Sequence, residues 1–557
     1  MLVLTMLLSS ILATTNVTIT EPIDGETYDG DWLPLRAIVE NENEVPDSVH
    51  YSLNGASVVQ IPRLNTDWPT YMQNYQNHGY SESPAPHENT ILWAAPVTGY
   101  EHEFPTPVVY EGVVYYPQNY GGDDLYALDA ATGKIIWVYE GTGWTDDAVT
   151  IDNGILYTAS DSLFCINAYT GEKIWSSSKG NMIGSTPIVV DGRVFCGNGN
   201  NVVCLDSADG TLIWTWDVGA YTASCLAFSQ NRLFVAKTAN GISAIDANDG
   251  SLLWENNDHW YFDSSPVVDG NHIYTCCMDG YAFAINAETG ITEWSSTLAG
   301  EITATPALYQ DRLYFATESN KTYYCLDALD GVPIWTSHYN HHGSSGAADG
   351  LVFFGTVLNT NPDTASVVAL DMLTGTEVWR YRTSCNNNWG FQSSPSITDG
   401  VMYYACTDGY LYAFGTGLKY TYKEDYFYAD VGSNELIVTS WDDGVAAAAD
   451  TINFTVTQTG ITLEPSRQLR LSADPNPFCG STAISFELTE SGPVALQVFD
   501  LTGRLILDLS DNIASQGINT IHWDGCSNSG EPVSSGLYLC RIECEGVVET
   551  TGLCVLK

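Results

Sequence analysis

Hydrophobic and polar residues alternate in short runs along most of the chain, and turns rich in glycine separate the runs. The segment TPVVYEGVVYYPQNYGGDDLYALDAATGKIIWVYEG (106–141) contains four such runs. A period of two is typical of strands that bury one face, and glycine supplies the positive φ that a tight hairpin needs. The pattern therefore predicts an all-β chain, with four strands in this segment.

The four-strand segment recurs with a period of about forty residues, which for all-β units is typical of propeller blades. Each copy is marked by a tryptophan in a strand, and these are Trp93, Trp137, Trp175, Trp214, Trp254, Trp294, Trp335 and Trp379. From the second onward, each tryptophan follows a turn that ends in glycine, from AATG (130–133) to MLTG (372–375). The last repeat, 391–417, lacks a tryptophan strand of its own, and a spare one stands at 90–97. We predict an eight-bladed β-propeller over 64–417 whose eighth blade is completed by the Trp93 strand, because closure removes exposed sheet edges.

These repeats resemble the PQQ-like (pyrroloquinoline-quinone type) propeller family from about residue 82 to 417. The segment DWPTYMQNYQNHGYSESPAP (67–86) is similar to the run-in of that family. The resemblance implies the fold and leaves the function open, since the family includes quinone-dependent dehydrogenases and the non-catalytic BamB-type outer-membrane assembly proteins.

Two flanking segments, 17–63 and 418–456, each look like about half of an immunoglobulin-like domain. We predict a single split immunoglobulin-like sandwich with the propeller inserted between its halves, because insertion is tolerated when the inserted domain's ends lie close together. A linker at 457–468 follows.

The C-terminal segment 469–557 carries DPNPF (474–478), FDLTGR (499–504) and WDG (523–525). Together these motifs resemble the FlgD-like immunoglobulin fold and the similar C-terminal sorting domain of type IX secretion. The resemblance implies recognition by an export machinery and surface attachment, although a purely structural β-sandwich accounts for the same strands.

The first thirteen residues, 1–13, form a short apolar run that ends in small residues and resembles a secretory signal peptide. The run is too short to span a bilayer, so no transmembrane anchor is expected after its cleavage. Lys and Arg number 19 against 67 Asp and Glu, giving a net charge of -48. Such a field repels phosphates and excludes nucleic acid as a partner. The predicted location is extracellular or the cell surface.

Few residues suggest chemistry. PQQ dehydrogenases hold a disulfide of adjacent cysteines against the cofactor, and Cys276 and Cys277 are adjacent, but in a strand they point to opposite faces and are expected to pack. Other cysteines, namely Cys165, Cys204 and Cys325, replace Ala127 of the repeat and are expected in the core. The cluster His338, His341 and His342 fits either a metal site or a polar loop. We predict no catalytic residue, no metal site and no cofactor; PQQ with calcium belongs only to the alternative below.

Bulky residues collect in the connections between successive blades, which all emerge at one end of the propeller. This predicted binding face comprises Tyr100, His102, Phe104, Trp144, Tyr221, His259, Trp260, Phe262, His338, Tyr339, Trp389 and Phe391. Large rigid side chains suit a protein, peptide or glycan ligand, and packing between blades explains them equally well. The sequence favours a secreted or cell-surface binding or scaffold protein that is not an enzyme. The alternative is a PQQ-dependent periplasmic or extracellular oxidoreductase.

Overall fold

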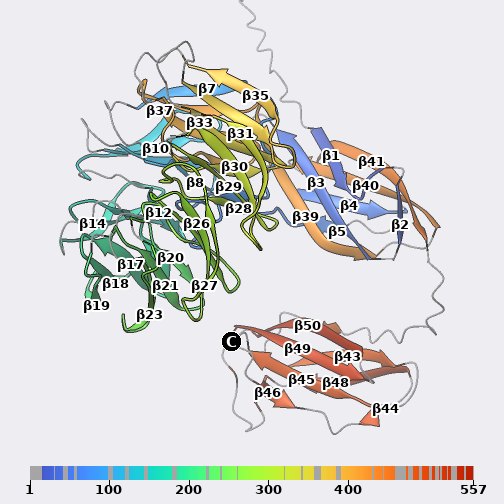
Figure 1. Cartoon of the computed structure of the whole chain (residues 1–557). Helices are drawn as coiled ribbons and strands as arrows, with labels where there is room; N and C mark the ends of the chain where they lie inside the picture. The colour runs from blue at the N-terminus through green and yellow to red at the C-terminus, as the bar shows by residue number, and fades with distance from the viewer. Residues whose placement is uncertain are drawn as a thin grey trace, which may run out of the picture. The chain divides into compact units, whose positions relative to one another are not determined.

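The computed structural model describes most of residues 16–457 and the strands between 472 and 555. Its main gaps are 42–47, 55–58, 98–104, 119–123, 143–147, 179–184, 340–342, 357–364, 384–389, 458–471 and 475–480, and single residues or short segments are missing elsewhere. The signal peptide predicted at 1–13 and most of the linker predicted at 457–468 lie outside these residues. The chain divides into two compact units, Met1–Thr457 and Gln458–Lys557 (Figure 1).

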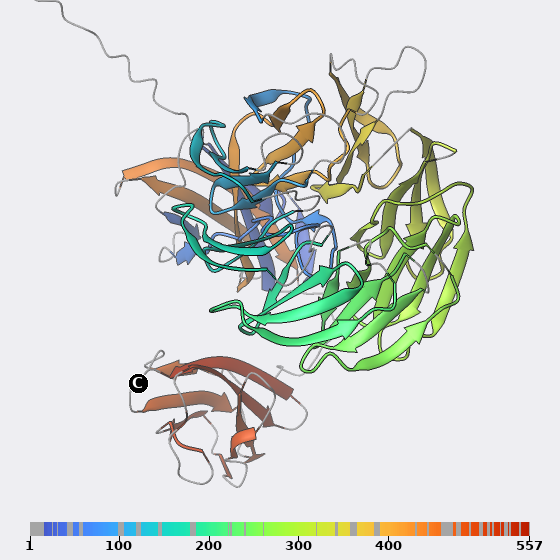
Figure 2. The ribbon, with the colours of Figure 1, turned by 90° about the vertical axis from the view of Figure 1, so that its left-hand side faces the viewer.

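The described residues form strands, turns and bends, as the alternating pattern predicts, and contain no helix long and apolar enough to cross a membrane. In the first unit, the described residues include eight four-stranded antiparallel sheets, one of which gains a fifth strand. Figure 2 shows these sheets fanned around a common centre. This is the blade arrangement of a β-propeller.

Each of these sheets runs from a short inner strand to an outer strand. The inner strands are β8 (Val108–Tyr110), β12 (Thr150–Asp152), β16 (Ile188–Val190), β20 (Ala227–Ser229), β24 (Val267–Asp269), β28 (Ala307–Tyr309), β32 (Gly346–Ala348) and β36 (Ser396–Thr398). The second strands are β9 (Val113–Pro117), β13 (Ile155–Ala159), β17 (Arg193–Asn198), β21 (Arg232–Ala236), β25 (His272–Cys277), β29 (Arg312–Thr317), β33 (Leu351–Thr356) and β37 (Val401–Cys406). The third strands are β10 (Leu125–Asp129), β14 (Leu163–Asn167), β18 (Asn201–Asp206), β22 (Ile242–Asp246), β26 (Tyr281–Asn286), β30 (Thr322–Asp327), β34 (Ser366–Asp371) and β38 (Tyr410–Phe414). The outer strands are β11 (Ile135–Tyr139), β15 (Lys173–Ser177), β19 (Leu212–Asp217), β23 (Leu252–Asn256), β27 (Thr292–Thr297), β31 (Pro333–His338), β35 (Glu377–Arg382) and, for the last sheet, β7 (Ile91–Pro96).

The repeated tryptophans join neighbouring sheets. The indole N–H of Trp254 donates to the carbonyl of Ala287 in the next sheet, at 3.1 Å, and the other tryptophans from Trp93 to Trp335 make the equivalent bond. A Cβ on Gly290, whose φ is +72°, would lie 2.6 Å from the Trp254 ring. The turn glycine is therefore required twice, for its left-handed backbone and for the close approach of the indole.

The outer strand of the last sheet comes from the N-terminal side of the repeats. Strand β7 pairs antiparallel with β38, with Trp93 opposite Ala413, as the repeat pattern predicts. The Trp93 indole donates to the carbonyl of Ala130 in the first sheet at 2.8 Å. Trp379, whose neighbour has no turn glycine, donates instead to the carbonyl of Pro86 just before β7, also at 2.8 Å.

Segments 16–61 and 418–457 pair with each other in two further sheets of the first unit. Their strands are β1 (Asn16–Glu21), β2 (Thr27–Asp29), β3 (Trp32–Asn41), β4 (Ser48–Leu53), β5 (Val59–Ile61), β39 (Leu418–Tyr428), β40 (Gly432–Asp442) and β41 (Val445–Thr457). One sheet has the order β1-β3-β39 and the other β2-β41-β40-β4-β5. The two ends of the unit thus form one module, and its buried residues join a core that continues into the first and last propeller sheets.

A belt, defined here as residues 66–83, connects this module to the propeller and runs past the inner strands in turn. Its backbone carbonyls accept hydrogen bonds from the N–H groups of the middle residues of six inner strands. These pairs are Trp68–Val109, Pro69–Ile151, Tyr75–Phe228, Gln76–Val268, His78–Leu308 and Gly79–Ala347, at 2.7–2.9 Å. Strand β6 (Tyr80–Ser81) then adds to β32 in parallel. The belt joins sheets that are far apart in sequence.

The second unit has its own core, around the buried Trp523. Its strands are β42 (Ser472–Asp474), β43 (Thr482–Leu488), β44 (Gly492–Pro493), β45 (Ala495–Asp500), β46 (Leu505–Asp508), β47 (Ile513–Ala514), β48 (Gly517–Trp523), β49 (Gly536–Cys544) and β50 (Val547–Val555). They form sheets of three, two and four strands.

Candidate functional site

The propeller has two ends, which differ in the connections between strands that lie there. At the turn end lie the turns between first and second strands, such as Glu111–Gly112, and those between third and fourth strands. At the loop end lie the connections from each outer strand to the next inner strand. The belt bonds to the inner strands one residue before their turn-end termini. Each of these strands has three residues, so the belt bonds lie equally far from the two ends.

Hydroxyl groups surround the axis where the inner strands begin. The backbone N–H of Ser265 donates to Thr305 Oγ1 at 2.9 Å, and the N–H of Thr305 donates to Ser344 Oγ at 2.9 Å. The N–H of Ser394 donates to Thr106 Oγ1 at 3.4 Å, which links the last sheet to the first. All these hydroxyl side chains are buried. They bond one blade to the next near the loop end.

Tyr71 of the belt lies across the axis. Its ring packs on the core between the first two sheets and also on the core between the sixth and seventh. Its hydroxyl lies 3.0 Å from both Thr305 Oγ1 and Ser344 Oγ. The aromatic ring is half-buried. Tyr71 therefore connects the belt to sheets on two sides of the propeller.

The residues predicted as a binding face differ in burial, and several of them lie outside the described residues. Phe262 and Phe391 are buried at 2% and 0% exposure, so they pack within the propeller. His259 is half-buried against Phe283, with ring centroids 4.1 Å apart, and burial lowers its pKa. His338 is exposed, and Tyr339 is half-buried with its hydroxyl 3.0 Å from Glu377 Oε2. Tyr100, His102, Phe104, Trp144, Tyr221, Trp260 and Trp389 lie outside the described residues, and for them the binding role stays a prediction.

The cysteines are packing residues, as the sequence predicts. Cys165, Cys204 and Cys325 are buried opposite the repeat tryptophans. Cys276 belongs to the core between the fifth and sixth sheets, whereas Cys277 belongs to the core between the fourth and fifth. Both are free thiols whose pKa is raised, chiefly by burial. Because they face opposite sides of β25, they cannot both lie against one cofactor.

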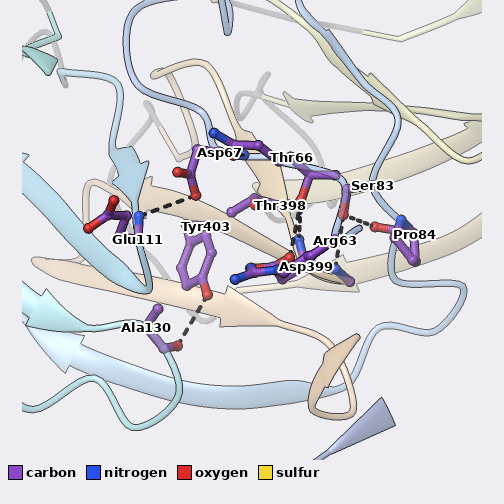
Figure 3. A network of polar contacts seen from close by, with 12 residues as sticks. Arg63, Thr66, Asp67, Ser83, Pro84, Glu111, Ala130, Thr398, Asp399 and Tyr403 are labelled. Carbon is purple, nitrogen blue, oxygen red and sulfur yellow. Dashed lines mark hydrogen bonds and ion pairs between the residues drawn. The ribbon is translucent and has the colours of Figure 1, made fainter. Parts of the chain in front are cut away.

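A separate cavity of about 390 Å³ opens at the turn end, between the propeller and the N-terminal module. It is lined by Arg63, Asn65, Asp67, Val109, Tyr110, Glu111, Gly112, Ala130, Thr398, Asp399, Tyr403, Leu418 and Tyr420. Figure 3 shows its polar network. The sequence did not predict this site, because 67 acidic residues gave no reason to rank Asp67 or Asp399 above the rest.

Asp399 is the better compensated of the two aspartates. Its Oδ2 lies 2.7 Å from the Arg63 guanidinium, and its Oδ1 accepts the Thr66 hydroxyl at 3.1 Å. Burial raises its pKa, and Arg63 opposes that effect. The guanidinium also lies 4.5 Å from the centre of the Tyr420 ring. Arg63 thus contacts both the Asp399 carboxylate and the Tyr420 ring.

Asp67 forms no ion pair with any of the described residues. Its Oδ1 accepts the backbone N–H of Glu111 at 3.2 Å, and the residue is only 9% exposed. Burial raises the pKa of Asp67 to about 6, with Asp399 adding repulsion. Among the described residues, no group of three or more His, Cys, Asp or Glu side chains is arranged to hold a metal ion. Of the predicted cluster, His341 and His342 lie outside the described residues, so the choice between a metal site and a polar loop stays a prediction.

The four-stranded blades, the tryptophan contacts and the axial belt together define a β-propeller of the PQQ-type repeat class. The profile described as "Outer membrane protein assembly factor BamB" matches residues 85–179, 121–217, 159–260, 257–357 and 324–419, together more than half of the chain. The chain belongs to this family, as the sequence resemblance implied for the repeats.

The curated relatives that the chain matches are named as dehydrogenase subunits, not as assembly factors. The dehydrogenase subunit of alcohol dehydrogenase (quinone) from Komagataeibacter europaeus is 24% identical over 199 residues, which cover 29% of this chain and 26% of the relative. The corresponding subunit from Gluconobacter oxydans (strain 621H) is 26% identical over 189 residues, 27% of this chain and 24% of the relative. The chain thus matches about a quarter of the length of these relatives.

Solved structures with the same fold include the quinohemoprotein alcohol dehydrogenase ADHIIG of Pseudomonas putida HK5. It has a TM-score of 0.53 at 15% identity and covers 64% of this chain and 80% of its own. The enzyme from Comamonas testosteroni gives a TM-score of 0.51 at 14% identity, over 66% of this chain and 82% of its own. At this identity the likeness concerns the fold.

These comparisons contradict two predictions made from the sequence. The chain was expected not to be an enzyme and to use no cofactor, yet the curated relatives that it matches are named as quinone-dependent dehydrogenase subunits. Both predictions relied on the sequence offering few residues that suggest chemistry. That was a poor guide, because functional residues are found mostly in loops, which leave no repeat pattern.

Proposed function

We propose that the chain is an exported oxidoreductase that uses a quinone of the PQQ class, held on the propeller axis at the loop end. The observation that carries the proposal is the similarity to the quinone-dependent alcohol dehydrogenase subunits. A bound quinone would supply the electron acceptor for oxidation of an alcohol.

The described residues fit such a cofactor in part. PQQ is flat and carries carboxylate and carbonyl acceptors, which suit the ring of Tyr71 and hydroxyl donors such as Thr305 and Ser344. Cys276 and Cys277 do not fit the role that adjacent cysteines have in PQQ dehydrogenases, because they belong to different cores.

The test is a titration of the purified full chain with PQQ, with and without calcium, followed by dye-linked oxidation of primary alcohols. Calcium is included because the charge of -48 repels an anionic cofactor. Thr305→Val should weaken PQQ binding about tenfold, whereas Thr305→Ser, which keeps the hydroxyl, should bind like the parent chain, since a hydrogen bond to a charged acceptor contributes about 1.5–3 kcal/mol. Absence of both binding and turnover would refute the proposal.

We further propose the finer architecture predicted from the repeats, a closed ring of eight blades carried by a split immunoglobulin-like module. The pairing of β7 with β38 and the hydrogen bond from Ser394 to Thr106 support closure. The pairing of β3 with β39 and of β4 with β40 supports the split module. The C-terminal unit is proposed as a FlgD-like or type IX sorting domain that export machinery recognises, which gives an extracellular or cell-surface location.

Binding of another protein is a second candidate activity of the propeller, favoured by membership of the BamB family. Outer strands expose aliphatic side chains, among them Ile135, Ile136, Leu212, Ile213, Leu252 and Leu253 at 45–52% exposure. Such residues are the kind that a protein partner covers. Pull-down with Leu252→Ser and Leu253→Ser chains would show whether this surface is used.

A further inference from the structure

The cavity at the turn end combines negative charge with aromatic walls. Asp67, Glu111 and Asp399 line it with one cation, Arg63, and the remaining walls include Tyr110, Tyr403 and Tyr420. Two of the three carboxylates already have partners, because Asp399 binds Arg63 and Glu111 Oε2 accepts the Tyr169 hydroxyl at 2.9 Å. Glu111 is exposed to solvent, so among the described residues Asp67 is the nearly buried carboxylate of the cavity that has no ion pair.

One oxygen of Asp67 is available to the cavity. Oδ1 accepts the N–H of Glu111, and within the described residues no donor is bonded to Oδ2. A carboxylate that is nearly buried is costly to ionise unless a cation or a donor meets it. A ligand that brings a positive charge and an N–H donor would satisfy both requirements.

We propose that this cavity binds a small primary ammonium compound, with the Asp67 carboxylate as its anionic partner. The volume of about 390 Å³ is in the range of small-molecule sites, which span roughly 300–1,000 Å³. The tyrosine rings pack against the carbon chain of the ligand, and ring faces favour a neighbouring cation. The site lies at the opposite end of the propeller from the one proposed for the quinone, so the two are separate.

A divalent metal ion fits the same residues poorly. Calcium takes six to eight oxygen ligands. Here Asp399 Oδ1 and Oδ2 are occupied by Thr66 and Arg63, and a Glu111 oxygen by Tyr169. Recruiting these carboxylates would break an ion pair and two hydrogen bonds. An organic ammonium ion needs only the one oxygen that Asp67 offers.

The experiment is calorimetric titration of the full chain with n-butylammonium chloride, with neutral n-butyramide as the probe of similar size. Asp67→Asn should weaken n-butylammonium binding at least tenfold, since it removes the charge and keeps the acceptor for the Glu111 N–H. The matched control is Asp263→Asn, because Asp263 is another aspartate whose pKa is raised by burial but lies in the connection between β23 and β24 at the loop end. Asp263→Asn should bind n-butylammonium like the parent chain.

The pH profile gives a second readout. With a pKa of about 6, roughly one tenth of Asp67 is ionised at pH 5, so binding should be about tenfold weaker at pH 5 than at pH 7.5. Arg63 stays charged over this range, and Asp399, whose pKa is also raised, changes in the same direction. Glu111, from the turn of the first sheet, is the other carboxyl group facing Asp67.

Four results would overturn the proposal. Binding that is equal in Asp67→Asn and the parent chain would place the ligand elsewhere. Equal affinity for n-butyramide would show that charge is not recognised. No heat or chemical-shift change at millimolar n-butylammonium would show that the cavity takes no ammonium ion, and tight calcium binding lost in Asp67→Asn would identify a metal site instead. None of these outcomes depends on whether PQQ binds.

Discussion

At the scale of single residues, the propeller depends on a pair that repeats from blade to blade, a tryptophan in one outer strand and a glycine in the turn of the next sheet. The indole supplies a hydrogen bond and a flat surface, and the glycine lets that surface approach. Gly133, Gly171, Gly210, Gly250, Gly290, Gly331 and Gly375 would each place a Cβ 2.5–2.8 Å from a tryptophan ring. Neighbouring blades are therefore held by the same contact at each of these junctions.

Gly290→Ala tests this contact. The substitution strains a backbone at φ +72° and drives a methyl group into the Trp254 ring, so the free energy of unfolding should fall by about 2–4 kcal/mol. Gly270→Ala is the control in the same blade, since its φ is +55° and no atom lies within 4 Å of the added Cβ. It should cost only about 1 kcal/mol. Equal losses in guanidinium denaturation would show that backbone strain alone requires the glycine.

Asp67→Asn should stabilise the protein at neutral pH. The folded-state pKa of Asp67, about 6, lies above its ordinary value of 3.8, so the carboxylate opposes folding once both states are ionised. Relative to the Asn chain, the parent should therefore lose stability as the pH rises from about 4 to 6, by on the order of 1–2 kcal/mol. Denaturation at pH 4 and pH 7.5 measures this difference. A less stable Asp67→Asn chain at pH 7.5 would mean that the charge is compensated.

At the scale of elements, the belt connects the sheets of the propeller to one another. Six inner strands are bonded to it through backbone groups, and Asn77 Nδ2 donates to the carbonyls of Leu226 and Pro266 at 3.1 and 2.9 Å. A segment of eighteen residues thus contacts sheets that are separated by more than two hundred residues. Non-local contacts of this kind are costly in entropy to form and contribute cooperativity once formed.

The sequence predicted the repeated elements well and the belt poorly, for a physical reason. Strands and turns leave a periodic trace, so the repeat pattern alone matches Trp93 to the last blade, where β7 pairs with β38. The belt bonds through its backbone, which leaves no trace in side-chain pattern. Asp67 and Asp399 are likewise brought together by tertiary structure from positions 332 residues apart. Loop residues such as Trp260 were chosen by bulk alone, and the buried Phe262 shows why bulk is ambiguous.

The pairing of β7 with β38 should open more easily than the other strand pairings of the propeller, because β7 joins the last sheet from a distant part of the chain. Trp93→Phe removes the 2.8 Å bond to Ala130 and should lower hydrogen-exchange protection of the β7 and β38 amides about tenfold. Trp254→Phe removes the equivalent 3.1 Å bond between the fourth and fifth sheets. It should leave the hydrogen-exchange protection of the β7 and β38 amides unchanged. A uniform loss of protection in both variants would mean that the propeller opens only as a whole.

At the scale of the whole molecule, the chain consists of two units that have separate cores. Unit Met1–Thr457 contains the propeller, the belt and the paired terminal segments, and unit Gln458–Lys557 is organised around Trp523. Two cores imply that one unit can be removed without unfolding the other. This separation suits a passenger whose export signal lies in the second unit.

Deleting Gln458–Lys557 should leave the melting temperature of the first unit unchanged and should stop delivery to the cell surface, leaving the chain in the periplasm. The first part follows from the separate cores, and the second from the motifs that resemble a type IX sorting domain. Trp523→Ala is the companion variant. It removes a side chain that is 1% exposed and should unfold the second unit alone, since large-to-small core changes cost about 3–5 kcal/mol. If recognition needs the folded domain, Trp523→Ala should stay in the periplasm as well, as fractionation and surface labelling would show. Surface display of the deleted chain would leave the second unit with a structural role only.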